Sequence, residues 1–141
     1  MSDKEKKFRS LVVSMLKPVG AFPVENLVGE PGCPDVCTTL GWLELKIASR
    51  PARATTRVSV DLRPAQALWL RRWRRLGGRA WTLTLLGESL WLLHDGAWSA
   101  DHLGSEPELR LISEAIMVRE NAPTSEELIL HLMSPMHRKG N

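Results

Sequence analysis

The sequence has little cysteine, no tyrosine and no long apolar run. Its two cysteines, Cys33 and Cys37, are too few for a disulfide framework. A zinc site would need two further ligands, and His94 and His102 are the only candidates in the middle of the chain. We therefore expect two reduced thiols in a cytosolic protein, with a zinc-binding regulator as an alternative.

The sequence also gives no sign of a membrane partner. No segment approaches the roughly 20 apolar residues that a membrane-spanning helix needs. The N-terminus is charged, and the apolar residues 11–16 are too few for a secretion signal. Without repeats or low-complexity tracts, the 141 residues are expected to form one soluble, cytoplasmic domain.

Basic residues are concentrated in one part of the chain. The net charge is only +3, but the segment from Arg50 to Arg79 contains nine arginines and a single acid, Asp61. Such a concentration is typical of a nucleic-acid partner. The alternative is a solvated helix face.

Apolar spacing predicts a mixed α/β fold, with a central sheet flanked by helices. Pro18 and Gly20 should end a first helix, and Gly77 should follow a second, arginine-rich one. We expect residues 1–98 to form the core, and residues 99–141 to form a helical extension of the same domain. The predicted helices are 3–17, 64–76, 108–118 and 125–133, and the predicted extended segments are 22–28, 35–40, 42–48, 80–86 and 89–94.

An acid and a base share one face of the strand predicted over residues 42–48. Side chains alternate along a strand, so Glu44 and Lys46 point the same way. If the hairpin has a loop of two or four residues centred between residues 39 and 40, Asp35 lies opposite Glu44. Two facing carboxylates are destabilising unless one is protonated or a cation lies between them. Two carboxylates and several waters suit Mg²⁺, and Lys46 could orient or help deprotonate an attacking water. The alternative is an exposed face on which a Glu and a Lys are paired by chance.

The same residues resemble a known nuclease motif. Gly32-Cys33-Pro34-Asp35, followed by Gly41-Trp42-Leu43-Glu44-Leu45-Lys46, is similar to the PD-(D/E)XK nuclease superfamily. The similarity is greatest to small phage-type proteins of the virus-type replication-repair nuclease (VRR-NUC) group. It extends over about residues 20–95, through Val24-Glu25-Asn26 and the helix that begins Pro64-Ala65-Gln66. It departs from the pattern at Arg63, where a Thr or Ser is frequent, and ahead of Glu25, where a basic residue is frequent.

This resemblance implies a restriction-endonuclease-like core and a role for each matching residue. Asp35 and Glu44 would bind Mg²⁺ or Mn²⁺ with the Leu45 carbonyl, and Glu25 would complete or adjust the metal site. Lys46 would position the attacking water, and Gln66 would support the site.

The arginines that follow this motif in the sequence are candidates for phosphate contacts. Arg suits bidentate phosphate binding. The DNA-binding residues that we expect are Arg50, Arg53 and Arg57 in the loop after the catalytic strand, and Arg71, Arg72 and Arg75 on the following helix. Trp42, on the catalytic face, could stack on a base.

Together these features predict a metal-dependent DNA endonuclease, encoded by a phage or a bacterium. The resemblance implies a preference for branched DNA, such as a Holliday junction, and a junction enzyme needs two active sites and hence a homodimer. The alternatives are a general nickase or replication-linked nuclease, and a non-catalytic DNA-binding module.

Overall fold

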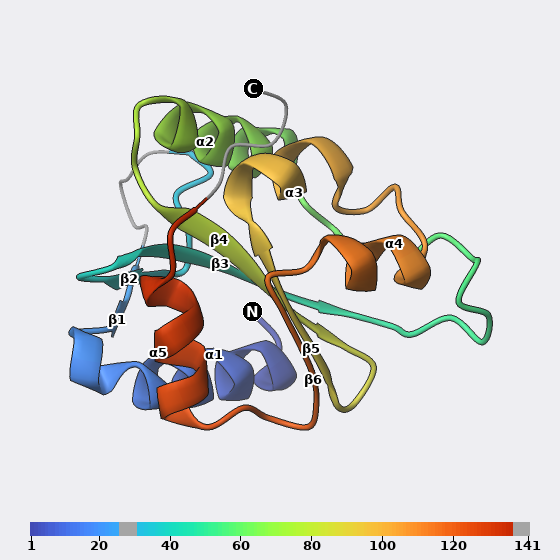
Figure 1. Cartoon of the computed structure of the whole chain (residues 1–141), viewed down its shortest axis with the longest axis horizontal. Helices are drawn as coiled ribbons and strands as arrows, with labels where there is room; N and C mark the ends of the chain where they lie inside the picture. The colour runs from blue at the N-terminus through green and yellow to red at the C-terminus, as the bar shows by residue number, and fades with distance from the viewer. Residues whose placement is uncertain (26–30, 137–141) are drawn as a thin grey trace.

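A six-stranded mixed sheet forms the centre of the protein (Figure 1). The computed structural model describes residues 1–25 and 31–136. The strands lie in the order in which they occur in the chain, and only β3 and β4 run parallel. The strands are β1 (Phe22–Pro23), β2 (Val36–Thr38), β3 (Gly41–Ala48), β4 (Ala80–Leu86), β5 (Leu90–Asp95) and β6 (Met117–Glu120). The helices are α1 (Asp3–Met15), the 3-10 turn η1 (Lys17–Val19), α2 (Pro64–Arg75), α3 (Gly96–His102), α4 (Glu108–Glu114) and α5 (Ser125–Met133).

The parallel pair requires a long crossover, and α2 lies within it. A tight turn can join only antiparallel strands. Pro64 begins α2, because its fixed φ suits the first helical position and its missing N–H is not needed there. After the helix, a Cβ at Gly78 would lie 2.3 Å from Nε1 of Trp73, so only glycine fits beneath that ring.

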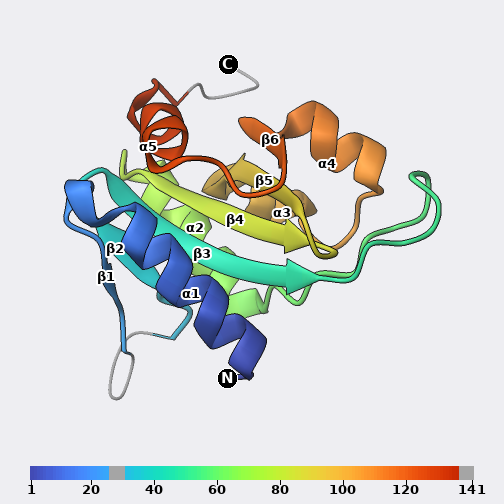
Figure 2. The same cartoon turned by 90° about the horizontal axis from the view of Figure 1, so that it is seen from below.

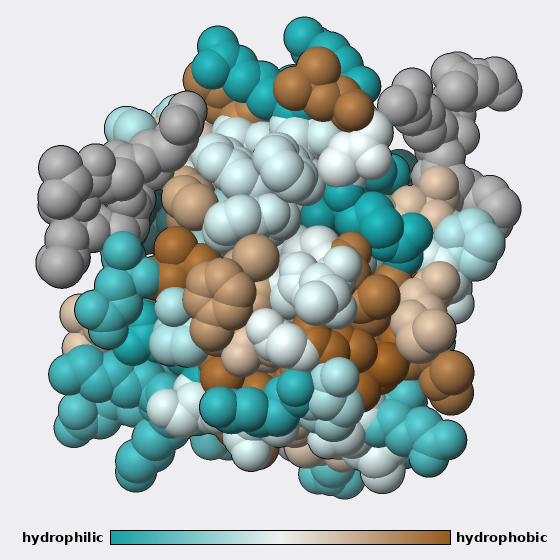
Figure 3. Space-filling view, turned by 90° about the vertical axis from the view of Figure 1, so that its left-hand side faces the viewer, coloured by the Kyte–Doolittle hydropathy of each residue, from teal (hydrophilic) through white to brown (hydrophobic). Residues whose placement is uncertain are grey.

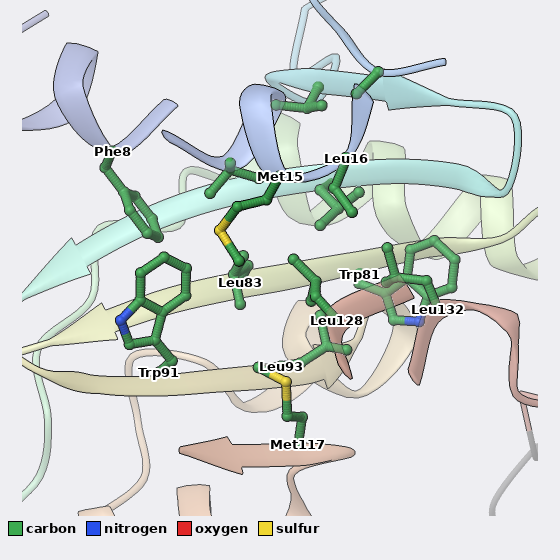
Figure 4. Packing of buried hydrophobic residues seen from close by; sticks show 14 residues of the cluster. Phe8, Met15, Leu16, Trp81, Leu83, Trp91, Leu93, Met117, Leu128 and Leu132 are labelled. Atoms are coloured by element: carbon green, nitrogen blue, oxygen red, sulfur yellow. The ribbon is translucent and has the colours of Figure 1, made fainter. Parts of the chain in front are cut away.

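Different helices cover the two faces of the sheet (Figures 1 and 2). The alternation of side chains along β3, β4 and β5 gives each face its own apolar cluster. One face, shown in Figure 4, packs Trp81, Leu83 and Leu93 against α1 and α5. The opposite face packs Leu86 and Leu92 against residues that include Leu111 of α4. Because α1 lies on one face while α2 and α3 lie on the other, the centre of the sheet is covered from both sides.

The loop after β3 is anchored to the segment that precedes α4. Val58 is fully buried, and its N–H donates to the Glu106 carbonyl at 2.9 Å. The Leu109 N–H donates to the Ala54 carbonyl at 3.2 Å, and Arg57 donates to the Gly104 carbonyl at 2.6 Å. These bonds hold the loop that carries Arg53 and Arg57 against the segment from Gly104 to Leu109.

The α/β architecture predicted from the sequence is confirmed, with two corrections in its C-terminal part. The prediction of a helix over 108–118 is wrong at its end, because residues 117–120 form β6 and pair with β5. α3 was not predicted, since seven residues are too few for a periodic pattern. Its local signal is Asp95, whose carboxylate caps the helix by accepting from the Ala97 N–H.

Residues 99–136 contribute to the hydrophobic core and do not form only a surface extension. The boundary expected between residues 98 and 99 falls inside α3, and Leu128 and Leu132 of α5 are fully buried in the larger apolar cluster. Across residues 1–25 and 31–136, no helix has the length and apolar character that crossing a membrane requires. The extended segment predicted over 22–28 is a strand at Phe22–Pro23, and residues 26–28 lie outside the described residues.

Candidate functional site

A cavity of about 610 Å³ opens where β3 continues past the end of β2. The last pair between these strands is Val36 with Leu43, so within residues 1–25 and 31–136 no strand lies beside the outer edge of β3 from Glu44 onward. The first turn of α1 and the beginning of α2 form the walls on either side of this edge. The lining residues include Asp35, Glu44, Leu45, Lys46 and Gln66.

The tight β2–β3 turn sets the position of Asp35. Thr38 pairs with Gly41, which leaves a two-residue loop, and the Thr38 hydroxyl oxygen accepts from the N–H groups of Leu40 (3.0 Å) and Gly41 (3.1 Å). Continuing this register by one residue beyond Val36 places Asp35 opposite Glu44, as the sequence predicted. The Asp35 Oδ2 atom accepts a hydrogen bond from the Leu45 N–H at 2.9 Å.

Glu44 is a buried acid with one oxygen left unpaired. It is 2% exposed, and its Oε1 accepts from Gln66 Nε2 at 3.2 Å and lies 3.7 Å from Lys46 Nζ. Its Oε2 is buried without a hydrogen-bond partner. Burial raises the pKa of Glu44 well above its ordinary value, and the neighbouring Asp35 carboxylate adds to the rise, while Lys46 opposes it.

Lys46 is held in one orientation by two acceptors. Its Nζ donates to the Asp61 carbonyl at 2.6 Å and to Oε1 of Gln66 at 2.9 Å. The same Gln66 oxygen accepts from the Arg63 N–H at 3.0 Å, so Gln66 also caps the beginning of α2. Gln66 thereby links the Glu44 and Lys46 side chains of β3 and lies at the cavity.

The oxygen atoms at the edge of β3 fit a hard divalent cation. Two facing carboxylates, one with a buried unpaired oxygen, form an environment in which a positive charge relieves both desolvation and repulsion. The N–H and C=O of a strand residue point to the same side, so the Leu45 carbonyl is directed to the open edge as its N–H is. Mg²⁺ needs few protein ligands, because it keeps several waters.

The structure does not bring Glu25 to this cavity. Its side chain is exposed, and it is not among the lining residues. Within residues 1–25 and 31–136, no three His, Cys, Asp or Glu side chains are grouped closely enough to hold a metal ion together. The acids that the structure does bring together are therefore Asp35, just before β2, and Glu44 on β3.

Residues of α1 at the cavity were missed by the sequence analysis. Lys4, Glu5 and Arg9 line it, together with the N-terminal residues Met1 and Ser2. The pKa of Glu5 is lowered, chiefly because its carboxylate accepts from the Ser2 hydroxyl, with smaller contributions from the N-terminal amine and Lys46. The Ser2–Glu5 capping box is visible in the sequence as a helix start, but nothing local shows that this helix lies beside β3.

The arginines predicted to bind DNA fall into two groups. Three have acceptors within the protein: Arg50 binds Glu108 (2.7 and 3.0 Å) and Glu120 (3.1 Å), Arg57 binds the Gly104 carbonyl, and Arg71 binds Asp101 (2.9 Å). The other group is exposed and outside these pairs: Arg53, Arg72 and Arg75. Arg50 thus fastens the end of β3 to α4 and β6, while the exposed group keeps its charge toward solvent.

Cys33 and Cys37 are near the site but form no disulfide. The histidines suggested as zinc partners are engaged elsewhere. His94 is buried, with its Nε2 atom 2.7 Å from the Leu111 carbonyl oxygen, and burial lowers its pKa to about 4. His102 stacks on Trp98 and lies 3.1 Å from Glu106.

In comparisons with known proteins, no family model matches this chain and no curated protein matches it.

Proposed function

We propose that this chain is a metal-dependent endonuclease that hydrolyses phosphodiester bonds in DNA. The observation that carries the proposal is the Glu44 carboxylate, which is buried, faces Asp35 and leaves Oε2 without a partner. A protein gains no stability from such an acid, because a buried carboxyl oxygen without a partner is costly whether the group is charged or protonated. A bound cation supplies the missing interaction.

Each residue at the edge of β3 has a chemical role in this proposal. Asp35, Glu44 and the Leu45 carbonyl would hold Mg²⁺ or Mn²⁺, which lowers the pKa of water and neutralises phosphate charge. Lys46, fixed by Asp61 and Gln66, would orient the attacking water and stabilise negative charge on the phosphate. Gln66 would fix the positions of the Glu44 and Lys46 side chains by hydrogen-bonding to both.

The surroundings of the cavity favour a polyanionic substrate. Lys4, Arg9 and the exposed Arg63 line it, together with the further acids Glu5 and Asp61. Such cations are suited to phosphate contacts, which position DNA without reading its sequence. A module that only binds DNA would gain nothing from buried acids facing a phosphate, so we favour the enzyme over the binding module.

The test is a cleavage assay with purified protein, Mg²⁺ or Mn²⁺, and labelled linear duplex, nicked duplex, flap and four-way junction. Cleavage should be lost with Asp35→Asn, with Lys46→Ala and with a chelator, and it should persist with Asp101→Asn, an exposed acid outside the cavity. Binding without metal-dependent cleavage of any of these DNAs would overturn the proposal.

The preference for branched DNA and the homodimer remain predictions, and both can be tested with the same protein and the same set of DNAs. Preferential cutting of the four-way junction would support a resolvase, and equal cutting of the nicked duplex would support a general nickase. Mass measurement in solution, with and without junction DNA, would establish the number of chains.

A further inference from the structure

Three of the six tryptophans gather beside the candidate active site. The rings of Trp69 and Trp73 are stacked, with centroids 5.1 Å apart and an interplanar angle of 19°. Trp42 packs against both, at 5.3 Å from Trp69 and 6.1 Å from Trp73. The cluster is not fully enclosed, since Trp73 is 37% exposed and the other two are partly exposed.

The cluster is continuous with the catalytic face. Trp42 precedes Glu44 by two residues on β3, so the two side chains point to the same face of the sheet. Trp69 and Trp73 follow Gln66 by three and seven residues on α2, which places all three along one side of that helix. A nucleic-acid strand whose phosphate lies at Glu44 and Lys46 therefore has the tryptophans directly along its path.

Trp73 is held in place without being covered. Its Nε1 donates to the Arg79 carbonyl at 3.1 Å, and its ring lies over Gly78, where a Cβ would be 2.3 Å away. A ring fixed at one edge loses little freedom when a ligand stacks on it, which favours binding.

The charge around the cluster is positive. α2 contains no acid, and its exposed arginines are Arg72, about 60° round the helix from Trp69, and Arg75, which points further away. Neither arginine takes part in an ion pair within residues 1–25 and 31–136. Figure 3 shows the side of the molecule where α2 ends, on which apolar surface is interspersed with hydrophilic side chains rather than forming one apolar face.

We propose that Trp42, Trp69 and Trp73, with Arg72 at their margin on α2, form a tryptophan surface that stacks unpaired bases of the DNA substrate. The inference rests on the proposed nuclease function and adds that the substrate carries a single-stranded segment next to the cleaved phosphate. Stacking on aromatic rings and backbone contact with arginines are the two interactions by which single strands are bound without sequence preference. In duplex DNA the bases are already stacked on one another, so only the arginines would contribute.

A second copy of this chain is a poorer occupant for the same surface. A two-fold contact through α2 would bring Arg72 and Arg75 of both copies together without acids to neutralise them. An acidic protein segment is the other candidate, and the experiment separates it from DNA.

The experiment measures fluorescence anisotropy of labelled oligonucleotides with the full chain in the presence of a chelator, so that binding is read without chemistry. The probes are a single-stranded thymidine 20-mer, a blunt duplex and a duplex with a single-stranded flap. Trp73→Leu keeps apolar volume but removes the ring, Trp73→Phe keeps a smaller ring, and Trp98→Leu is a matched tryptophan control on α3, outside the cluster.

We expect Trp73→Leu to weaken binding of the single strand and the flap about tenfold, with little change for the blunt duplex. Trp73→Phe should restore most of the affinity, and Trp98→Leu should leave all three affinities unchanged. Arg72→Met should weaken binding of every probe and reduce its salt dependence.

Equal loss for the blunt duplex and the single strand, or no loss in Trp73→Leu, would overturn the tryptophan surface. No binding of any DNA, with capture of an acidic peptide instead, would also overturn it. This result is separable from the nuclease proposal. If cleavage requires Asp35 but is unchanged by substitution of Trp73, only the tryptophan surface is refuted. If single strands bind in a Trp73-dependent way but no metal-dependent cleavage occurs, only the nuclease proposal is refuted.

Discussion

Replacing Glu44 by glutamine should make the metal-free protein more stable. Glu44 is 2% exposed, its Oε2 has no partner, and Asp35 faces it. Burying a carboxylate costs several kcal/mol, which Lys46 and Gln66 offset only in part. Glutamine has almost the same shape and no charge, so Glu44→Gln removes this cost while keeping the packing.

The expected gain is about 1–3 kcal/mol, the usual cost of one unsatisfied buried polar group. For a domain of this size, that corresponds to a rise in Tm of roughly 3–9 °C. The measurement is thermal and urea denaturation with a chelator, beside Glu126→Gln, an exposed acid on α5, as the matched control.

Added Mg²⁺ or Ca²⁺ should then raise the Tm of the wild-type protein and leave that of Glu44→Gln nearly unchanged, because only the wild type keeps both carboxylates. A Glu44→Gln protein that melts below wild type in chelator would refute the reasoning. It would mean that Glu44 is a satisfied structural acid and that no cation is missing.

Three further predictions concern the fold around the site. The pKa of His94 is about 4 in the folded protein against an ordinary 6.5, so the unfolded chain binds a proton more readily than the folded protein does. The free energy of unfolding should therefore be unaffected by His94 above pH 6.5 and should fall by up to about 3 kcal/mol as the pH is lowered toward 4. His94→Gln should remove this part of the pH dependence in urea titrations, and an unchanged slope would contradict it. Arg50→Met should destabilise the fold by about 1–2 kcal/mol, because it leaves the buried Glu108 unpaired, and it should not weaken DNA binding. A loss of DNA affinity with unchanged stability would instead mean that Arg50 contacts DNA. Gly41→Ala should destabilise by at least about 1–3 kcal/mol, since φ is +146° and the new Cβ would lie 2.4 Å from the Arg79 carbonyl oxygen; a Tm equal to wild type would contradict it.

What the sequence could predict was set by short-range patterns. The β2–β3 hairpin is nearly local, so the spacing from Asp35 to Lys46 sufficed to predict which side chains share a face. Gln66 was placed through the resemblance, and the structure brings it to Glu44 although 22 residues separate them. β6 was mistaken for the end of a helix because its strand character comes from pairing with β5, which no local pattern near Met117 reveals.

For the arginines, too, the sequence shows where charge is concentrated but not which side chains are available to a partner. A basic segment predicts a nucleic-acid partner, but it does not say which cations are already paired within the fold. The acids that bind Arg50 lie 58 and 70 residues away in sequence, at Glu108 and Glu120. Arg72 and Arg75 differ from Arg50 only in having no such acids nearby, and that depends on how α2 packs.

Glu5 and Glu25 give the sharpest comparison between the resemblance and the structure. The resemblance assigns the accessory acid to Glu25, which is exposed outside the cavity, whereas Glu5 lines the cavity with Asp35 and Glu44. The pKa of Glu5 is lowered by its bonds to Ser2, so its carboxylate is charged at neutral pH and available to the site. Because Glu5 is not grouped with Asp35 and Glu44 closely enough to hold an ion together with them, it would act on the metal through its charge, and we expect Glu5→Gln to lower metal-dependent cleavage about tenfold and to raise the Mg²⁺ concentration needed for half-maximal rate.

Glu25→Gln should leave both quantities within about twofold of wild type. The comparison is clean, because glutamine can replace glutamate at the third position of a capping box and keep α1 intact, which unchanged helix content and Tm would verify. The opposite ranking, with Glu25→Gln impaired and Glu5→Gln active, would mean that the segment after β1 moves to the site when metal and DNA bind. Glu5 would then be a helix cap at the cavity wall and nothing more.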